Sequence, residues 1–292
     1  MRVVAGIVVR NLRLFFRDRL NVFFSLLGAI ILFALYTLFL SNLQTTGLTE
    51  SFPDAGEGAV KAFVDSWMFA GIVLITTVTT GLGALSVLVD DAQSGRFRDF
   101  LVSPIRRGQI VLGYLIAAVA VAVIMSLLVL ALSVIYLGLV DGLWLGPAAV
   151  LRAAGLVTLF CFAFTSLSAL VVSFVRTASA FSAMSTIIGT VLGFIAGAYI
   201  PVGSLPTTVG DVINALPFAQ AGMLLRRVFT AESLTAVTGG EPASDEALRA
   251  VYGIDSIVGE WLVPTGVAIA VLVGITVVCT ALSAMRIRAR IR

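Results

Sequence analysis

The chain contains six stretches without a charged residue, and each is long enough to cross a lipid bilayer. A spanning helix needs about 20 mostly apolar residues. Hydrocarbon offers the backbone no hydrogen-bond partners, and these runs lack the alternation of barrel strands, so we predict helices. The six stretches are Leu20–Thr49, Ser66–Val89, Gly108–Val140, Ala153–Val175, Thr177–Gly210 and Trp261–Met285.

The composition places these stretches in one membrane domain. Hydrophobic residues make up 59% of the 292 residues, and the mean hydropathy of +1.08 exceeds that of soluble domains. Six spans leave too little chain for a separate soluble domain. We therefore predict a single all-α membrane domain over 1–292, consisting of an interfacial helix at 1–19, spans one and two within 20–89, a cytoplasmic loop at 90–107, spans three to five within 108–199, an external region at 200–262 and span six at 263–285.

Positive charges orient the predicted spans. Of the 19 Lys and Arg residues, 14 lie before span one, in the loops after spans two and four, or after span six. Cytoplasmic segments carry the excess of Lys and Arg, so we expect both termini in the cytoplasm. The basic segment and apolar run at the start are too long for a signal peptide, so span one is expected to remain. The external basic residues are then Lys61, Arg152, Arg226, Arg227 and Arg249.

Missing residue types exclude several functions. The chain has no His, and Cys161 and Cys279 fall inside predicted spans, so we expect no catalytic residue, no metal site and no external disulfide. Its only lysine, Lys61, precedes Ala62, whereas a Walker A loop places Ser or Thr after the lysine. The uncharged stretches offer no carboxylate or His to carry a coupling ion. Either the protein is passive or a scaffold, or another subunit supplies its energy.

The first 19 residues are predicted to form a basic amphipathic helix. At 3.6 residues per turn Arg10, Arg13 and Arg17 lie away from an apolar face, which suits a helix in the cytoplasmic interface with its arginines at lipid phosphates. The alternative is that these arginines only determine topology. The apolar face comprises Val4, Ile7, Val8, Leu12, Phe15 and Phe16.

The segment from Asp90 to Tyr114 is the candidate functional loop. Gly95 breaks the chain, and a short helix over 96–102 ends at Ser103–Pro104, because the residue before proline disfavours the helical region. Its exposed aromatic face would fill a groove on a soluble partner. The alternative is a basic loop lying on lipid. The candidate contact residues are Gly95, Arg96, Phe97, Arg98, Asp99, Phe100, Leu101, Ser103, Pro104, Arg106 and Arg107.

Two further segments carry a pattern. Ser185, Gly189, Gly193 and Gly197 recur every four residues, which predicts a smooth helix stripe for close packing against a helix of this chain or of a second copy. The alternative is glycine facing lipid. From Ile200 onward, prolines break the helix at the outer edge of span five, and 219–229 is expected to form a short helix at the outer leaflet, or else a plain loop. The residues singled out there are Pro201, Pro206, Pro217, Phe218 and Arg226.

The loop resembles the cytoplasmic loop of type-2 ABC transporter permeases, such as the daunorubicin-resistance-like membrane subunits. The matching residues are Gly95, Leu101, Ser103, Pro104, Ile105 and Arg107. The resemblance extends over essentially the whole chain, including the basic first helix and the six spans. Two positions depart from the family pattern. The usual glutamate is missing, with Arg98 near its place and Asp99 beside it, and Tyr114 replaces a frequent lysine.

This resemblance implies the permease of an ATP-driven exporter in a bacterial inner membrane. The loop would hold the coupling helix that contacts an ABC ATPase subunit, and that subunit would hold ATP and Mg²⁺. Span five would lie near the interface with a second copy or a similar permease, and re-entrant helices would follow it. The expected substrate is a hydrophobic or amphipathic drug or antibiotic. A lipid or polyprenyl-linked glycan is the alternative, and a non-transporting sensor or assembly component is a different class. Membrane lipid is an expected partner, and nucleic acid is not.

Overall fold

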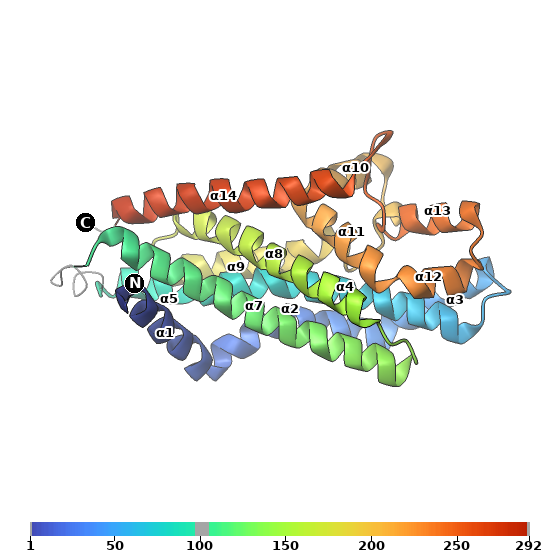
Figure 1. The fold of residues 1–292 in the computed structure, drawn as a ribbon, viewed down its shortest axis with the longest axis horizontal. Helices are drawn as coiled ribbons and strands as arrows, with labels where there is room; N and C mark the ends of the chain where they lie inside the picture. The colour runs from blue at the N-terminus through green and yellow to red at the C-terminus, as the bar shows by residue number, and fades with distance from the viewer. Residues whose placement is uncertain (1, 97–104, 291–292) are drawn as a thin grey trace.

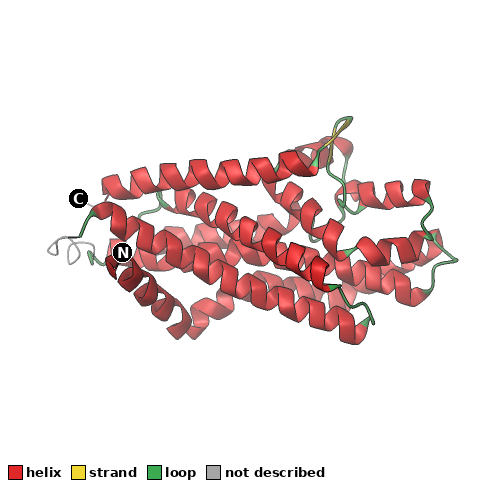
Figure 2. Ribbon diagram, in the orientation of Figure 1, coloured by secondary structure: helices red, strands yellow, loops and turns green. Residues whose placement is uncertain are grey.

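Helices long and apolar enough to cross a membrane run along the long axis of the molecule (Figure 1). The computed structural model describes residues 2–96 and 105–290, except for the side chains of Thr37 and Arg290. In that part of the chain there are six such helices, which confirms the predicted number and type. Within the same described residues, Figure 2 shows strand only in one short hairpin.

The six spans are built from eight α-helices and one π-helical turn, in chain order. Span one contains one π-helical turn between two α-helices, and span two has a break after Ala84. The segments are α2 (Arg19–Leu35), the π-turn Tyr36–Leu40 and α3 (Ser41–Ser51) for span one, α4 (Glu57–Ala84) and α5 (Ser86–Gln93) for span two, then α7 (Arg107–Val140), α8 (Pro147–Val172), α9 (Ala178–Ile195) and α14 (Thr265–Arg290).

The helix α4 forms the centre of the bundle. It packs against α2, α7 and α8, and almost every residue from Phe63 to Val78 is buried. A helix that is apolar on all sides belongs inside a helical protein. Glycines permit its closest approaches, since a Cβ at Gly71 would lie 2.8 Å from Ala198 Cβ. By contrast, α9 buries only Leu192 and Gly193, so most of its surface is uncovered.

The amphipathic first helix is present as α1 (Arg2–Arg17). It lies along α7 and buries Ile7, Asn11 and Phe15, which are spaced by four residues on one face. Gly113 of α7 allows this contact, because a Cβ there would lie 2.6 Å from Ile7 Cγ2. Part of the apolar face of α1 was predicted to contact lipid and instead packs against protein.

The region after span five forms short helices at the end of the molecule away from the termini (Figure 1). Each predicted proline break is confirmed: Pro201 precedes a 3₁₀ turn, Pro206 caps the next helix and Pro217 begins another. The elements are the 3₁₀ turn Val202–Ser204, α10 (Thr207–Ala215), α11 (Pro217–Phe229), α12 (Ala231–Thr238), α13 (Pro242–Val251) and the antiparallel strands β1 (Ile257–Val258) and β2 (Trp261–Leu262).

The helix α11 is packed among the spans. It contacts α4, α8 and α14, and nine of its 13 residues are buried. A helix is present where 219–229 was predicted, its position at the outer leaflet stays a prediction, and it is buried within the bundle. The reason for this burial is its composition, since small and apolar residues such as Ala221, Gly222 and Leu225 allow neighbouring helices to pack on both of its faces.

Three helix ends differ from the ends of the charge-free stretches. Span two begins at Glu57, so Lys61 and Asp65 lie inside its first turns, and span six begins at Thr265, after the hairpin. A charge-free run measures only the absence of charge, and helices continue past charges that find partners. The helix α9 ends at Ile195, which leaves Gly197 beyond the helical stripe.

Both termini and the ends of α5 and α7 that flank residues 97–104 lie at one end of the molecule (Figure 1). Ile7 of α1, Leu88 of α5, Ile110 of α7 and Ile287 of α14 share one apolar cluster there. An even number of spans requires this arrangement of the termini. It brings the first and last helices of the chain beside the ends of α5 and α7.

Candidate functional site

The candidate loop is described only on either side of residues 97–104. We call residues 94–96 the leading stem and residues 105–106 the trailing stem. Seven of its predicted contact residues lie outside the described residues: Phe97, Arg98, Asp99, Phe100, Leu101, Ser103 and Pro104. The helix α5 ends at Gln93, and Gly95 of the leading stem has φ +76°, a left-handed conformation that glycine adopts without strain. On the trailing stem the backbone N–H of Arg106 donates to Gln109 Oε1 at 3.1 Å and caps α7, which begins at Arg107.

Asp91 joins the leading stem to the first helix and to α7. Its carboxylate accepts two hydrogen bonds from Arg10, at 2.7 Å from Nη1 and 3.1 Å from Nη2. Arg96 Nη1 donates to Asp91 Oδ1 at 3.1 Å, and the hydroxyl of Tyr114 donates to Oδ2. One carboxylate therefore connects α1, the end of α5, the leading stem and α7.

Burial explains why Asp91 has so many partners. The Asp91 side chain is 1% exposed, whereas the Arg10 and Arg96 side chains are 31% and 56% exposed. A buried carboxylate is costly unless it is paired and hydrogen-bonded, and bonds to guanidinium are among the strongest available. The hydrogen bond to Asp91 raises the pKa of Arg10 further above its ordinary value.

This cluster is not predicted from the sequence, which suggests lipid phosphates as the partners of Arg10 and assigns no partner to Asp91. Two signals were present: Arg10 borders the apolar stripe of its helix, and Asp91 is the second of two aspartates that follow a long apolar run. Both indicate a charge at the edge of a buried surface, but neither indicates which partner it meets.

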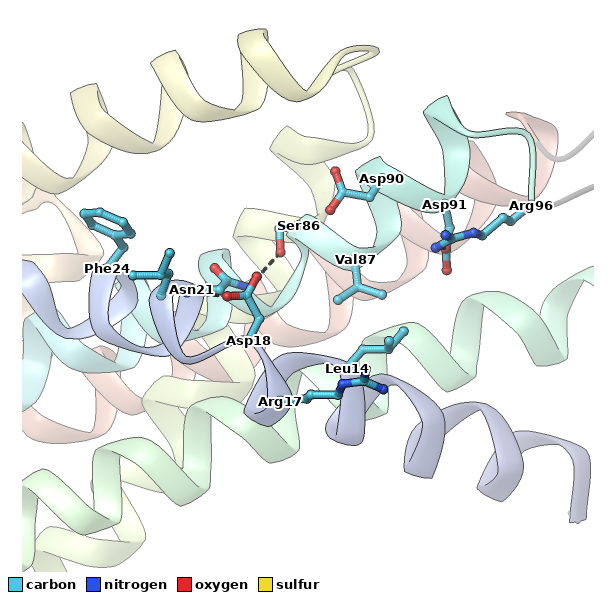
Figure 3. A pocket seen from close by; sticks show the side chains of 11 residues that line it. Leu14, Arg17, Asp18, Asn21, Phe24, Ser86, Val87, Asp90, Asp91 and Arg96 are labelled. Carbon is cyan, nitrogen blue, oxygen red and sulfur yellow. Dashed lines mark hydrogen bonds and ion pairs between the residues drawn. The ribbon is translucent and has the colours of Figure 1, made fainter.

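A hollow of about 590 Å³ lies beside the cluster, between α1, α2 and α5 (Figure 3). Asp91 and Arg96 lie close together near one end of it, and Phe24 lies at the other. Asp18 accepts from the backbone N–H of Asn21 at 3.1 Å and so caps α2, while Asn21 Nδ2 donates to Ser86 at 3.1 Å. The bend between α1 and α2 is thereby attached to span two.

A second buried charge lies at the other end of the molecule. Arg226 was predicted as part of the external region, and the structure buries it on α11 with 1% exposure. Its guanidinium donates to the carbonyls of Ala196 at 2.8 Å, Gly197 at 2.7 Å and Gly253 at 3.4 Å. It also lies 5.3 Å from the ring centroid of Trp67. Arg226 thus supplies donors to carbonyls that the end of α9 leaves open.

An ion cluster connects two spans near the same end. Lys61 Nζ donates to Asp65 Oδ2 at 2.6 Å, on its own helix α4, and to Asp141 at the end of α7. Both carboxylates are buried. This cluster explains why α4 continues as a helix through residues that the sequence analysis had placed outside the span.

The small-residue stripe has a different role at each position. Gly193 is covered by Tyr199 of the same chain, since a Cβ there would lie 2.1 Å from the ring. Gly197 has φ +60° and ends the helix, so its place on a continuous stripe was wrong. Gly189 has open space, with no atom within 4 Å of an added Cβ, and Ser185 is partly buried. Only the first half of the predicted stripe is available to another helix.

Phe218 lies inside the region that follows span five. Its ring stacks on Phe164 of α8 with centroids 4.8 Å apart and planes inclined by 20°. Together with Pro217 at the first position of α11, this contact fixes where the chain re-enters the bundle. Thus Phe218 and Arg226 hold the two ends of α11 against spans four, five and two.

A family model described as ABC-2 family transporter protein matches residues 44–285. A search among curated proteins found no match. The matched range covers well over half of the chain and includes most of the six spans. Together with the helical bundle, it establishes that this chain belongs to the ABC-2 family of transporter proteins, as a multi-pass membrane permease.

Proposed function

We propose that this chain is the permease of an ATP-driven exporter in a bacterial inner membrane. The family match over residues 44–285 carries the proposal, because permeases of ABC transporters work with an ATPase subunit. ATP and Mg²⁺ would reside on that separate subunit. The cluster around Asp91 supports a mechanical role for the loop end, since it links the leading stem to α1 and α7.

In this proposal the end that holds the termini faces the cytoplasm. The excess of Lys and Arg at that end supports this orientation. The uncovered side of α1 would lie at the lipid headgroups, with Arg13 and Arg17 at phosphates. The helix α11 would be re-entrant from the external side, which is supported by its burial among the spans and by the short helices that precede and follow it.

The loop would dock the ATPase subunit through the aromatic face predicted from Phe97 and Phe100. Replacing both with Ala is expected to leave membrane insertion intact and to abolish substrate-stimulated ATP hydrolysis by the complex. The measurement is ATPase activity with and without substrate after reconstitution. Full stimulation in the double variant would show that other residues make the contact.

Pairing with a second copy would use α9. Its surface supports this assignment, because all of the helix except Leu192 and Gly193 is at least partly exposed and Gly189 leaves room for a close neighbour. Small residues let helices approach closely in lipid, where van der Waals packing drives association. A similar permease in place of the second copy would use the same face.

The exported substrate would be a hydrophobic or amphipathic drug. The experiment is uptake into inverted vesicles with ATP, with a non-hydrolysable analogue and with a proton gradient alone. Accumulation is expected only with hydrolysable ATP. Accumulation driven by the gradient alone would overturn the exporter mechanism, and transport of a lipid-linked glycan in place of drugs would select the alternative substrate. Absence of any ATPase subunit after co-purification would favour a sensor or assembly component.

A further inference from the structure

The Asp91 cluster joins segments that are far apart in sequence. Arg10 lies 81 residues from Asp91, Tyr114 lies 23 residues away, and Arg96 of the leading stem lies five residues away. The helix α5 itself is only eight residues long. The position of the leading stem relative to α1 and α7 therefore depends on this carboxylate.

The helix α1 contacts α7 through apolar side chains and the end of span two through polar ones. Against α7 the helix packs through Ile7 and Phe15, an apolar surface that fixes its place on the bundle. Toward the end of span two, the polar link is the bidentate pair between Arg10 and Asp91. An ion pair with half-exposed arginines depends strongly on geometry, so small movements of the stem are transmitted through it.

The leading stem and α7 share the same carboxylate. Arg96 belongs to the leading stem, while Tyr114 lies about 10 Å along α7 from Arg107, at 1.5 Å per residue. If Asp91 loses its charge, all three partners lose the charged acceptor that they share. Arg10 also donates to the Tyr114 hydroxyl at 3.3 Å, so α1 stays linked to α7, whereas the leading stem loses its polar link to both helices.

We propose that Asp91 is a positioning residue that makes the interfacial helix α1 a moving part of the coupling mechanism, by tying it to the leading stem of the loop and to α7. The contribution of this residue to transport rests on the proposed function of the loop. We call the link from α1 through Asp91 to the leading stem the tether. The tether is a property of the permease alone, so it is tested separately from the contribution of Asp91 to transport.

The first test measures the tether in the isolated permease. Spin labels are attached at Val9→Cys on α1 and Ser94→Cys on the leading stem, with Cys161 and Cys279 replaced by Ala, in lipid nanodiscs. A single narrow distance distribution is expected. Asp91→Asn and Arg10→Gln are expected to broaden it, whereas Arg13→Gln, on an exposed position of the same helix, leaves it unchanged. A distribution that stays narrow in both cluster variants overturns the proposal.

The second test uses the complex of the chain with the ABC ATPase subunit that co-purifies with it. Asp91→Asn and Arg10→Gln are each expected to lower the ratio of substrate-stimulated to basal ATPase activity by about tenfold, the effect of losing a charged hydrogen bond. The double variant is expected to be no worse than Asp91→Asn alone, because each single variant already removes the Arg10–Asp91 pair. Additive losses, or normal stimulation in the single variants, overturn the proposal.

The two tests distinguish a failure of the tether from a failure of the proposed function. If the wild-type chain binds no ATPase subunit, the proposed function fails, and the distance measurement still decides whether Asp91 holds α1 to the stem. If Asp91→Asn does not fold, Arg10→Gln removes the same pair from the exposed side and carries both measurements. Thermal unfolding of each variant, compared with Arg13→Gln, identifies general destabilisation.

Discussion

The two ends of the molecule each bury a charge, and they satisfy it in opposite ways. At the loop end, Asp91 is surrounded by side chains that reach inward from half-exposed positions. At the other end, Arg226 is fully enclosed and donates to backbone carbonyls of Ala196, Gly197 and Gly253. Asp91 is thus held by side chains, whereas Arg226 completes the hydrogen bonding of the backbone.

This difference predicts different mechanical behaviour. Water can replace the partners of Asp91 when an arginine swings outward, so this cluster can open without unfolding a helix. The carbonyls bonded by Arg226 have no such route, because the surrounding residues exclude water. Regions with exposed polar links open at lower free energy than buried cores. We therefore infer an adjustable loop end and a fixed opposite end.

The largest expected effect is at Arg226. Arg226→Met keeps an unbranched apolar side chain but removes the guanidinium donors to three buried carbonyls. Each unpaired buried group costs about 1–3 kcal/mol, so we expect a loss of stability of about 3 kcal/mol or more. The measurement is thermal unfolding in detergent. The control is Arg227→Met, which removes a partly exposed pair with Asp255. Equal effects of the two variants would contradict a special role for the buried guanidinium.

The end of α9 that Arg226 caps offers the next test. Gly193→Ala forces a Cβ against Tyr199 and is expected to cost about 1–3 kcal/mol through overpacking. Gly189→Leu, four residues earlier and in open space, is expected to keep the stability. If α9 pairs with a second copy, this leucine variant lowers cross-linking between copies. We assign Gly193 to packing within the chain and Gly189 to contact between copies. If both variants lowered both the stability and the cross-linking, this assignment would be wrong.

Trp67 supports the same fixed end from the central helix. Its Nε1–H donates to the carbonyl of Tyr252 at 2.7 Å, and its ring lies beside the guanidinium of Arg226. Trp67→Phe removes the hydrogen bond and weakens the cation–π contact, with an expected cost of about 1–2 kcal/mol. The check is chemical unfolding of the purified protein. An unchanged midpoint would mean that water or another donor replaces the indole.

The smallest effect is expected from salt. Partly exposed ion pairs are worth about 0.2–1 kcal/mol and are screened by ions, so 1 M NaCl is expected to loosen α1 and to speed labelling of Ile7→Cys about twofold to fivefold. Ala221→Cys, buried on α11, is expected to label at the same slow rate in both conditions. Both native cysteines are replaced in these variants. Equal salt effects at the two sites would remove the contrast between the ends.

The sequence was sufficient for the features that depend on local chemistry. The six spans follow from charge-free runs, since each charge in hydrocarbon is costly wherever it lies in the fold. The breaks at Pro201, Pro206 and Pro217 follow from the missing N–H and fixed φ of proline. The helical face of α1 follows from the spacing of Ile7 and Phe15. None of these features needs knowledge of a distant segment.

The tertiary structure alone decided which charges are buried and which glycines are contacts. Asp91 meets Arg10 and Tyr114, and Arg226 meets the end of α9, across 23 to 81 residues of sequence. Gly193 is needed for Tyr199 of its own chain, which a repeat of small residues does not reveal. The physical reason is that hydropathy and helix periodicity specify each helix separately, whereas the partner of a polar group is set by how the helices pack together.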